Sequence, residues 1–433
     1  MTRRSDNYRP TLGQNAFRWF YSVLLALIVP FAFINLMIRG RKRNKDYNHR
    51  RFERFGFIRR PAKTGGYLFH CVSVGEVVAA SVLIKKIMRE EPDTSITVTT
   101  TTPTGSARVR DIFSDTVYHF YLPYDLHMAM SGMLRRLKPK MVLITEVELW
   151  PNFIHCCWRR DIPVVVVNAR MTDRSARRYK KLGILFTPML NKISHVCAQG
   201  QRDYDNYLFL GLDKQKLTLT NNIKFDQAVS AGAVLSEFHG VSRDSRTALI
   251  GGSTHDTEEL ALIRTYQQLK DEYPSLLLIL VPRHPERFNT VKKLLTEEKM
   301  NAVFSSEGGQ VMAETDVLLV DEMGKLNAAY QVASIAFVGG SLADRGGHNA
   351  LEPAAVKLPV IMGPNTYNNP MICQYLKDSG ALFIVNDATA LTACCKTLLA
   401  DPVKAADAGK AGYEVLRANQ GAVEKTIDVI RSL

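Results

Sequence analysis

From Tyr67 onward, short runs rich in β-branched residues alternate with longer stretches whose apolar residues recur at helical spacing. This alternation is typical of a parallel sheet wrapped by helices. The pattern predicts two sets of strands, at 67–74, 95–102, 117–122, 141–145, 163–168 and 195–198, and at 247–253, 276–282, 317–320, 335–339, 359–362 and 382–385. The predicted fold class is therefore α/β, with two doubly wound, Rossmann-like lobes.

A small and polar stretch at 229–246 separates the two sets of strands and is typical of an interdomain linker. A chain of 433 residues is also long enough for two domains of about 150–200 residues each. We therefore divide the chain into an N-terminal anchor with its basic flank at 1–45, a first domain at 46–235 and a second domain at 236–433.

An apolar run at 19–38 precedes the first domain and contains no formally charged residue. Its twenty residues could cross about 30 Å of hydrocarbon as a helix. Basic residues are more numerous after the run than before it, which predicts a retained anchor with the large domains on the cytoplasmic side. Because Pro30 and Asn35 interrupt the run, a helix lying in the plane of the membrane is the alternative.

The composition restricts the fold and the function less than the hydrophobic pattern does. A hydrophobic content of 46% with 23% charged residues indicates that most of the chain folds in water. The formal charge of +14 favours an acidic partner, and nucleic acid, anionic lipid headgroups and phosphorylated small molecules all qualify. Seven cysteines without a C-x-x-C pair fit neither a disulfide framework nor a zinc site, so a reducing compartment is expected.

Acidic side chains follow two predicted strands of the first domain. Glu76 stands at the start of an amphipathic helix, where it is either a carboxylate favoured by the helix dipole or a general base. Glu146 and Glu148 end an apolar strand at a spacing of two and so face the same way, although solvent exposure alone could explain them. Lys224 is a candidate cationic partner, or it simply pairs with Asp226. Two acids from separate strand ends suggest chemistry.

The second domain has features of a nucleotide site. Pro282 and Arg283 follow a strand and place a guanidinium where a base or phosphate could bind. The glycines of 346–347 precede a probable helix start, which would supply unpaired N–H groups for a phosphate, although an ordinary tight turn is the alternative. Glu352 could accept hydrogen bonds from ribose hydroxyls. We interpret Ser253 or Thr254 as a plain helix N-cap.

Several other chemistries lack their motifs. The sequence contains no P-loop, no zinc-binding H-E-x-x-H and no G-x-S-x-G nucleophile elbow. Asp203 and Asp205 resemble the metal-binding D-x-D motif found in some enzymes that use sugar nucleotides, but they fall within a predicted helix at 201–212. We assign them to a solvated face and predict neither a catalytic metal nor a cofactor.

Taken together, these segments resemble the motif series of bacterial transferases of 3-deoxy-D-manno-octulosonic acid (Kdo). The resemblance reaches nearly the whole chain and rests on Ser73-Val74-Gly75-Glu76, Glu146-Val147-Glu148-Leu149-Trp150-Pro151-Asn152, Asn168-Ala169-Arg170, Lys224-Phe225-Asp226, Pro282-Arg283-His284-Pro285-Glu286-Arg287-Phe288, Gly346-Gly347-His348-Asn349 and Leu351-Glu352. It implies a GT-B fold with two lobes facing a cleft. It also implies inverting, metal-independent transfer of Kdo from CMP-Kdo to a tetraacylated, bisphosphorylated lipid A precursor in lipopolysaccharide synthesis.

The resemblance assigns roles residue by residue. Glu76 matches the family's proton acceptor, while Glu146 and Lys224 match residues that stabilise the transition state. The domain at 46–235 would bind the acceptor and the domain at 236–433 the donor. The residues that match the family's CMP contacts are Pro282, Arg283, Met323, Gly324, Lys325, Asn349, Ala350, Leu351 and Glu352.

Three positions depart from the family pattern. Lys325 replaces a frequent Glu, Ala350 replaces a frequent Pro, and Asn221-Asn222 replaces a small pair before Lys224. We expect these changes to alter local shape and not the reaction.

The implied partners are the CMP-Kdo donor, the lipid A precursor and the anionic surface of a bacterial inner membrane, with no nucleic acid. A sugar-nucleotide epimerase of the same fold and a non-catalytic lipid-binding protein are the alternatives.

Overall fold

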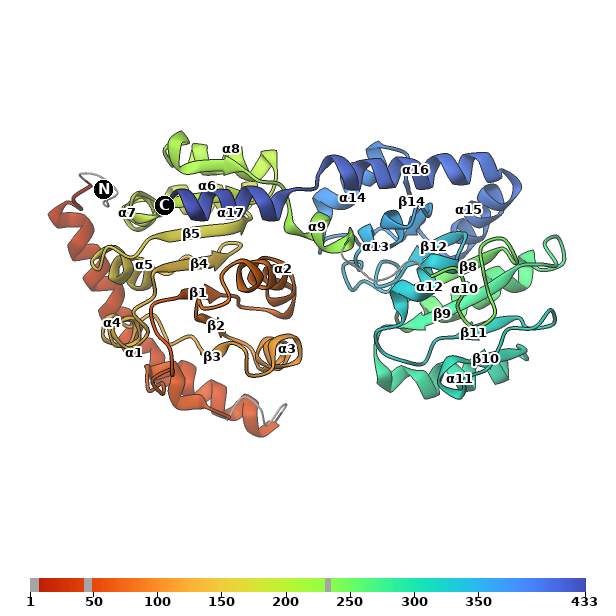
Figure 1. Cartoon of the computed structure of the whole chain (residues 1–433), viewed down its shortest axis with the longest axis horizontal. Helices are drawn as coiled ribbons and strands as arrows, with labels where there is room; N and C mark the ends of the chain where they lie inside the picture. Colours follow the sequence, from red (N-terminus) through yellow and green to blue (C-terminus); the bar gives the residue numbers. More distant parts are fainter. Residues whose placement is uncertain (1–7, 43–48, 230–234) are drawn as a thin grey trace. The chain divides into compact units, whose positions relative to one another are not determined.

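The computed structural model describes residues 8–42, 49–229 and 235–433. Contacts between residues divide it into two compact units (Figure 1). The first unit comprises Met1–Asp226 together with Gly421–Leu433, and the second comprises Gln227–Gln420. Each unit contains one parallel sheet with helices packed on it, which confirms the predicted α/β class.

The first unit contains a sheet of seven parallel strands in the order β3-β2-β1-β4-β5-β6-β7. Its strands are β1 (Tyr67–His70), β2 (Ile96–Thr100), β3 (Tyr118–Tyr121), β4 (Met141–Thr145), β5 (Val164–Ala169), β6 (His195–Ala198) and β7 (Leu217–Leu219). Its α-helices are α1 (Leu12–Lys42), α2 (Val74–Glu90), α3 (Pro103–Phe113), α4 (His127–Leu137), α5 (Pro151–Trp158), α6 (Asp173–Lys181), α7 (Gly183–Lys192), α8 (Gln201–Phe209), α9 (Ile223–Val229) and α17 (Ala422–Ser432).

The second unit repeats this strand order, as β10-β11-β9-β8-β12-β13-β14. Its strands are β8 (Ala248–Thr254), β9 (Leu277–Pro282), β10 (Ala302–Phe304), β11 (Val317–Leu319), β12 (Ile335–Val338), β13 (Val360–Met362) and β14 (Leu382–Ile384). Its α-helices are α10 (Glu258–Leu269), α11 (Phe288–Glu297), α12 (Leu326–Val332), α13 (Leu351–Ala355), α14 (Pro370–Asp378), α15 (Ala388–Ala400) and α16 (Pro402–Ala418).

Both faces of each sheet are buried, which explains why the strands are nearly continuous apolar runs. In β1 and β4, Leu68 and Val142 contribute to the core on one face, while Phe69 and Leu143 contribute to the core on the other. The twelve predicted strands coincide with observed ones. The prediction missed β7 and β10, which lie at the sheet edges and are mostly only half-buried, so that their apolar pattern is weaker.

Helix α1 is the one helix in the described part of the chain that is long and apolar enough to cross a membrane. Polar contacts nevertheless hold it against the first unit. Arg18 Nη1 donates a hydrogen bond to Asn152 Oδ1 at 2.9 Å, and Asn152 Nδ2 donates to Ser22 Oγ at 2.9 Å. The Tyr21 hydroxyl donates to Asp125, whose carboxylate also accepts the N–H of Asn152. Because Arg18, Ser22 and Asn152 are buried, this face of α1 belongs to the first unit.

The structure draws the domain boundary differently from the sequence analysis. The domain proposed at 236–433 included the C-terminal residues, but contacts group 421–433 with the first unit. The Asp226 carboxylate accepts hydrogen bonds from the N–H groups of Gly421 and Val423, both at 2.7 Å, and so caps the start of α17. Ile427 and Ile430 of α17 are then buried in the core of the first unit. Periodicity could predict this helix but not the sheet that it covers.

Replacement of Asp226 by Ala should destabilise the first unit. Two N–H groups at the start of α17 would lose their acceptor, and loss of a helix cap typically costs about 1–2 kcal/mol. Chemical denaturation should therefore show a lower free energy of unfolding for Asp226→Ala. The control is Asp407→Ala, since Asp407 is an exposed carboxylate on α16. Equal stability of the two variants would contradict this role for Asp226.

Candidate active site

Glu76 lies in the first turn of α2, just after β1, and its side chain is 7% exposed. Ser73 caps the helix and donates a hydrogen bond from Oγ to Glu76 Oε1 at 2.9 Å, while the N–H of Val72 donates to Oε2 at 2.8 Å. This arrangement resembles a capping box. Glu76 therefore stabilises the start of α2, which is one of the two roles that the sequence suggested. The contacts also fix the carboxylate at the carboxyl edge of the sheet.

The surroundings of Glu76 favour its protonated form. Burial first, and then the nearby carboxylates of Glu146 and Glu148, raise its pKa to about 7, against the lowering effect of its hydrogen bonds from Val72 and Ser73. A carboxyl group with a pKa near neutrality can accept a proton and release it again, as a general base must. The structure therefore places Glu76 together with both acids that follow β4.

Glu146 has a left-handed backbone, with φ 61°, which is unusual for a residue other than glycine. Its N–H donates to the carbonyl of Val167 at 3.0 Å and so keeps the turn against β5. Such strain persists only where surrounding contacts impose it, and it is concentrated at functional sites. Burial, and secondarily the charge of Glu146, raises the pKa of Glu148.

Lys224 lies on α9 and interacts electrostatically with Glu146. Burial lowers its pKa, Glu146 opposes this effect and Arg170 adds to it. Asn168 Oδ1 accepts the N–H of Ile223 at 3.1 Å, and Asn222 Oδ1 accepts the N–H of Lys224 at 3.0 Å. Asn168 thus ties the start of α9 to β5, Asn222 caps the helix, and together they position Lys224. Asn222, one of the departures from the family pattern, thus has a helix-capping role.

The carboxyl edge of the second sheet brings Arg283 and Glu352 into electrostatic contact. Burial raises the pKa of Glu352, whereas the hydrogen bond from Asn349 and the charge of Arg283 lower it. Asn349 Nδ2 donates to Glu352 Oε1 at 3.3 Å, and Asn349 Oδ1 accepts the N–H of Leu351 at 3.2 Å. Arg283 itself is fixed through its N–H, which donates to the carbonyl of Thr254 at 3.0 Å. Two predicted donor-site segments therefore meet here.

The remaining predicted CMP contacts lie around this pair. Pro282 ends β9, and Ala350 is the buried N-cap residue of α13. The segment formed by Met323, Gly324 and Lys325 connects β11 to α12 and is exposed. Because β11 is the neighbour of β9 in the sheet, this segment and Arg283 follow adjacent strand ends.

Known proteins with similar sequences identify the family. The family model described as "3-Deoxy-D-manno-octulosonic-acid transferase (kdotransferase)" matches residues 49–227. The chain is 39% identical to a 3-deoxy-D-manno-octulosonic acid transferase of Haemophilus influenzae, over 96% of this chain and 98% of that one. The chain belongs to the 3-deoxy-D-manno-octulosonic acid transferase family. It is accordingly a Kdo transferase, as the sequence motifs predicted.

Solved structures agree with the fold. The chain is similar to the C-terminal CMP-Kdo binding domain of WaaA from Acinetobacter baumannii, which is 30% identical and covers 45% of this chain and 97% of that one, with a TM-score of 0.40. It is also similar to UDP-GlcNAc 2-epimerase from Neisseria meningitidis, at 13% identity and a TM-score of 0.56, over 86% of this chain and 100% of that one. The second likeness concerns the GT-B-type fold alone, so it gives no support to the epimerase alternative.

The glycine-rich loops of this Kdo transferase differ from the expectation of unpaired phosphate-binding N–H groups. The N–H groups of Gly347 and His348 donate to the carbonyls of Gly340 and Gly339, at 2.8 and 3.0 Å. Helix α13, which follows, has only five residues, so few peptide dipoles add up at its start. The N–H groups of Gly347 and His348 are therefore not free to bind a phosphate.

Glu258 was missed by the sequence analysis, although it organises this edge. It is fully buried, and its carboxylate accepts five backbone N–H groups at 2.8–3.2 Å. The donors are His255, Gly340, Ser341, Leu342 and Ala343. Consecutive N–H groups of this kind form a nest for an anion, and here the anion is a side chain of the same chain. No local sequence pattern marks a residue that serves a loop more than eighty positions away.

Two further predictions need correction, one on a helix cap and one on solvent exposure. Ser253 and Thr254 are not an N-cap, because β8 continues through them and α10 begins only at Glu258. Asp203 does not lie on a solvated face, since it is fully buried and its Oδ1 accepts the N–H of Met171 at 2.7 Å. Asp205 is exposed, as predicted. Within the described ranges, no group of three or more His, Cys, Asp or Glu residues could hold a metal ion.

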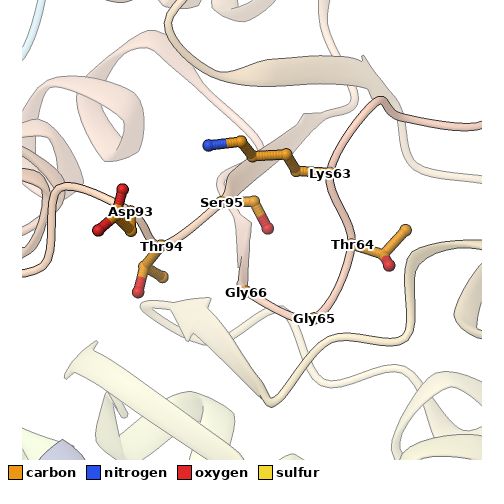
Figure 2. Close-up of a pocket in the computed structure, with 7 residues that line it drawn as sticks. All are labelled: Lys63, Thr64, Gly65, Gly66, Asp93, Thr94 and Ser95. Carbon is orange, nitrogen blue, oxygen red and sulfur yellow. The ribbon is translucent and has the colours of Figure 1, made fainter.

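A hollow of about 400 Å³ in the first unit lies away from Glu76 (Figure 2). It is found at the amino ends of β1 and β2, whereas Glu76 follows the carboxyl end of β1. The chain is tightly packed there, because a Cβ added to Gly66 would lie 1.7 Å from the carbonyl oxygen of Ser95. The residues around it are Lys63, Thr64, Gly65, Gly66, Asp93, Thr94 and Ser95.

Replacement of Glu258 by Ala should destabilise the second unit. The variant leaves five buried N–H groups without an acceptor, which should lower the free energy of unfolding by more than about 2 kcal/mol. Added formate, a small carboxylate, should raise the melting temperature of Glu258→Ala more than that of the unchanged chain. The control is Glu297→Ala, which removes an exposed carboxylate of α11. If Glu258→Ala melts like this control, the carboxylate does not hold the loop.

Proposed function

We propose that this Kdo transferase moves Kdo from CMP-Kdo to a hydroxyl of a tetraacylated, bisphosphorylated lipid A precursor in lipopolysaccharide synthesis, with Glu76 as the general base. The observation that carries the proposal is the buried Glu76 carboxyl at the carboxyl edge of the first sheet, whose pKa is raised to about 7. The motif series and the membership of the Kdo transferase family support this choice of donor and acceptor.

Glu76 has the properties that the acceptor hydroxyl requires. A sugar hydroxyl is a poor nucleophile at neutral pH, and a positioned base that removes its proton typically contributes about 10²–10⁴-fold in rate. In the proposed step, the hydroxyl oxygen forms a bond to the anomeric carbon of Kdo while its proton passes to Glu76. The bond from that carbon to the phosphate oxygen breaks, CMP departs, and the configuration inverts.

Charged residues near Glu76 fit the accompanying change of charge. We assign Glu146 and Lys224 to stabilisation of the transition state, because they interact electrostatically with each other and Glu146 also interacts with Glu76. The cation of Lys224 would favour negative charge that develops as CMP leaves. Glu148 is the alternative base, since burial and the charge of Glu146 raise its pKa as well.

In the second unit, we propose that Arg283 binds the phosphate of CMP. A guanidinium is suited to a phosphate because its fixed N–H fork matches two phosphate oxygens. Glu352 would accept hydrogen bonds from the ribose hydroxyls, and Asn349 orients its carboxylate. Main-chain atoms of Pro282, the 323–325 segment and the 350–351 segment would complete the site. Lys325 can make such a contact although the family often has Glu there.

The proposed location is the cytoplasmic face of an inner membrane. Apolar side chains of α1 are exposed along its length, among them Phe20 at 61%, Leu27 at 65% and Phe31 at 73%. Since Arg18 and Ser22 on the other side of α1 are buried against the first unit, we favour a helix that lies in the membrane surface over one that crosses it. This arrangement would keep the first unit beside a lipid acceptor.

Glu76→Gln should keep the fold and CMP binding but lower the rate of Kdo transfer by about 10²-fold or more, because the amide cannot accept the proton. For the unchanged enzyme, kcat/KM should fall as the pH drops below about 7, since protonated Glu76 cannot act as a base. Glu76→Gln should lose this acidic limb. Single-turnover transfer over a range of pH measures both effects. A fully active Glu76→Gln enzyme would instead favour Glu148 as the base.

Arg283→Ala should weaken CMP binding by more than about tenfold, because a charge-assisted hydrogen bond to phosphate contributes about 1.5–3 kcal/mol. Calorimetric titration with CMP measures the affinity directly. Lys293→Ala, which removes an exposed cation of α11, is the control for loss of positive charge. Unchanged CMP affinity in a folded Arg283→Ala variant would argue against Arg283 as the phosphate ligand.

A further inference from the structure

Helix α6 carries an unusual concentration of positive charge. Its exposed cations include Arg174, Arg177, Arg178 and Lys181, here called the α6 basic face. At 100° per residue, these four positions lie within about 100° of one another on the helix circumference. Ala176, the buried residue of α6, lies on the opposite side. The four side chains therefore form a single basic stripe directed away from the core.

Pairing with acidic neighbours does not account for this stripe. Among the described residues, the ion pairs involve none of the four side chains of the α6 basic face. The spacing of Arg174 and Arg178, and of Arg177 and Lys181, is i,i+4, at which like charges destabilise a helix. An anion outside the chain would offset this repulsion.

The helix dipole explains only part of the stripe. Cations are favoured in the last turn of a helix, and Arg178 and Lys181 occupy that turn. Arg174 lies in the first turn, where the helix dipole disfavours a positive charge. Its position is therefore not explained by the stability of α6.

Helix α6 is connected to the candidate base by Tyr179, which lies about 100–160° around the helix from the four residues of the α6 basic face. Glu76 interacts electrostatically with Glu146 and Glu148. The Tyr179 hydroxyl of α6 interacts in turn with Glu148 and with Arg178, while its ring stacks on Phe186 of α7 with the ring centroids 4.0 Å apart. Through Tyr179, α6 therefore lies near the acids around Glu76, and its basic face is on the outward side of the helix.

Apolar side chains lie beside the basic stripe. Leu182 and Ile184, at the start of α7, are 48% and 49% exposed, and Phe209, at the end of α8, is 50% exposed. Lys180 of α6 donates a hydrogen bond to the carbonyl of Phe209 and lies over its ring. Cations beside exposed apolar groups suit a ligand that carries both phosphates and acyl chains.

We propose that the α6 basic face binds the phosphate groups of the lipid acceptor and thereby orients its hydroxyl toward Glu76. This inference rests on the proposed function for the identity of the acceptor. Arg side chains match phosphate oxygens in pairs, and the stripe is long enough, at about 1.5 Å per residue, to contact phosphates at separate positions. The face therefore determines which acceptor is used rather than performing the transfer.

The test compares Arg174→Ala/Arg178→Ala with a control that loses the same charge, Lys404→Ala/Lys410→Ala on the exposed surface of α16. For the bisphosphorylated acceptor, the α6 variant should raise KM about tenfold or more, because lost charge-assisted contacts weaken binding by at least that factor. Its kcat and its KM for CMP-Kdo should change little. The control should behave like the unchanged enzyme.

Two further measurements identify the anion. With the same lipid after enzymatic removal of its phosphates, the α6 variant and the unchanged enzyme should have equal KM values. Cosedimentation with phosphatidylglycerol vesicles should also be equal for the two proteins. An unchanged KM for the phosphorylated acceptor, an equal rise with the dephosphorylated lipid, or a parallel loss of vesicle binding would each overturn the proposal, the last by assigning α6 to the bulk membrane surface.

Failure of the proposed function can be separated from failure of this inference. If the unchanged enzyme transfers no Kdo to the acceptor, the proposed function is wrong. Binding of the bisphosphorylated lipid in neutral detergent micelles, measured by fluorescence anisotropy, does not require transfer. Weaker binding by Arg174→Ala/Arg178→Ala than by Lys404→Ala/Lys410→Ala would then still support the α6 basic face as a phosphate site, and equal binding would reject it.

Discussion

Carboxylates that accept backbone N–H groups hold together the edges of both sheets. Glu258 accepts five such groups, Asp226 accepts two at the start of α17, and Asp125 accepts two at the start of α5. An unpaired buried charge is costly, and an unpaired buried N–H group is costly too, so each compensates for the other. The loops that carry candidate site residues depend on these pairings.

Glu76 uses the same arrangement with a different outcome. It accepts one backbone N–H and one hydroxyl group, as a residue at a helix start ordinarily does. Unlike Glu258, it also faces two further carboxylates, Glu146 and Glu148, which make its ionised form less favourable. Structural and chemical roles are thus not alternatives for Glu76. The hydrogen bonds hold the carboxyl in place, and the neighbouring charges adjust its proton affinity.

Sequence periodicity was sufficient for the two sheets because both are buried on both faces, so their strands are marked apolar runs. For Glu76, Arg283 and Glu352 it predicted the positions, because the carboxyl ends of parallel strands collect on one edge, while the roles of these residues stay predictions. It failed for Glu258 and Asp203, whose burial depends on loops and strands distant in sequence. It also failed for α17, since nothing within 421–433 encodes which sheet the helix covers.

The two faces of α1 differ in their contacts, which bears on the proposed location of the enzyme at a membrane. A helix that crossed the bilayer alone would need no polar partners, yet Arg18 and Ser22 share hydrogen bonds with Asn152 at the start of α5. Asp125 accepts N–H groups from that same helix start. The contacts that hold the apolar helix therefore also hold an element of the first sheet's core, since Phe153 and Ile154 of α5 are buried there. The packing of α1 and the integrity of the first unit consequently depend on one set of hydrogen bonds, and a change at Asn152 would disturb both.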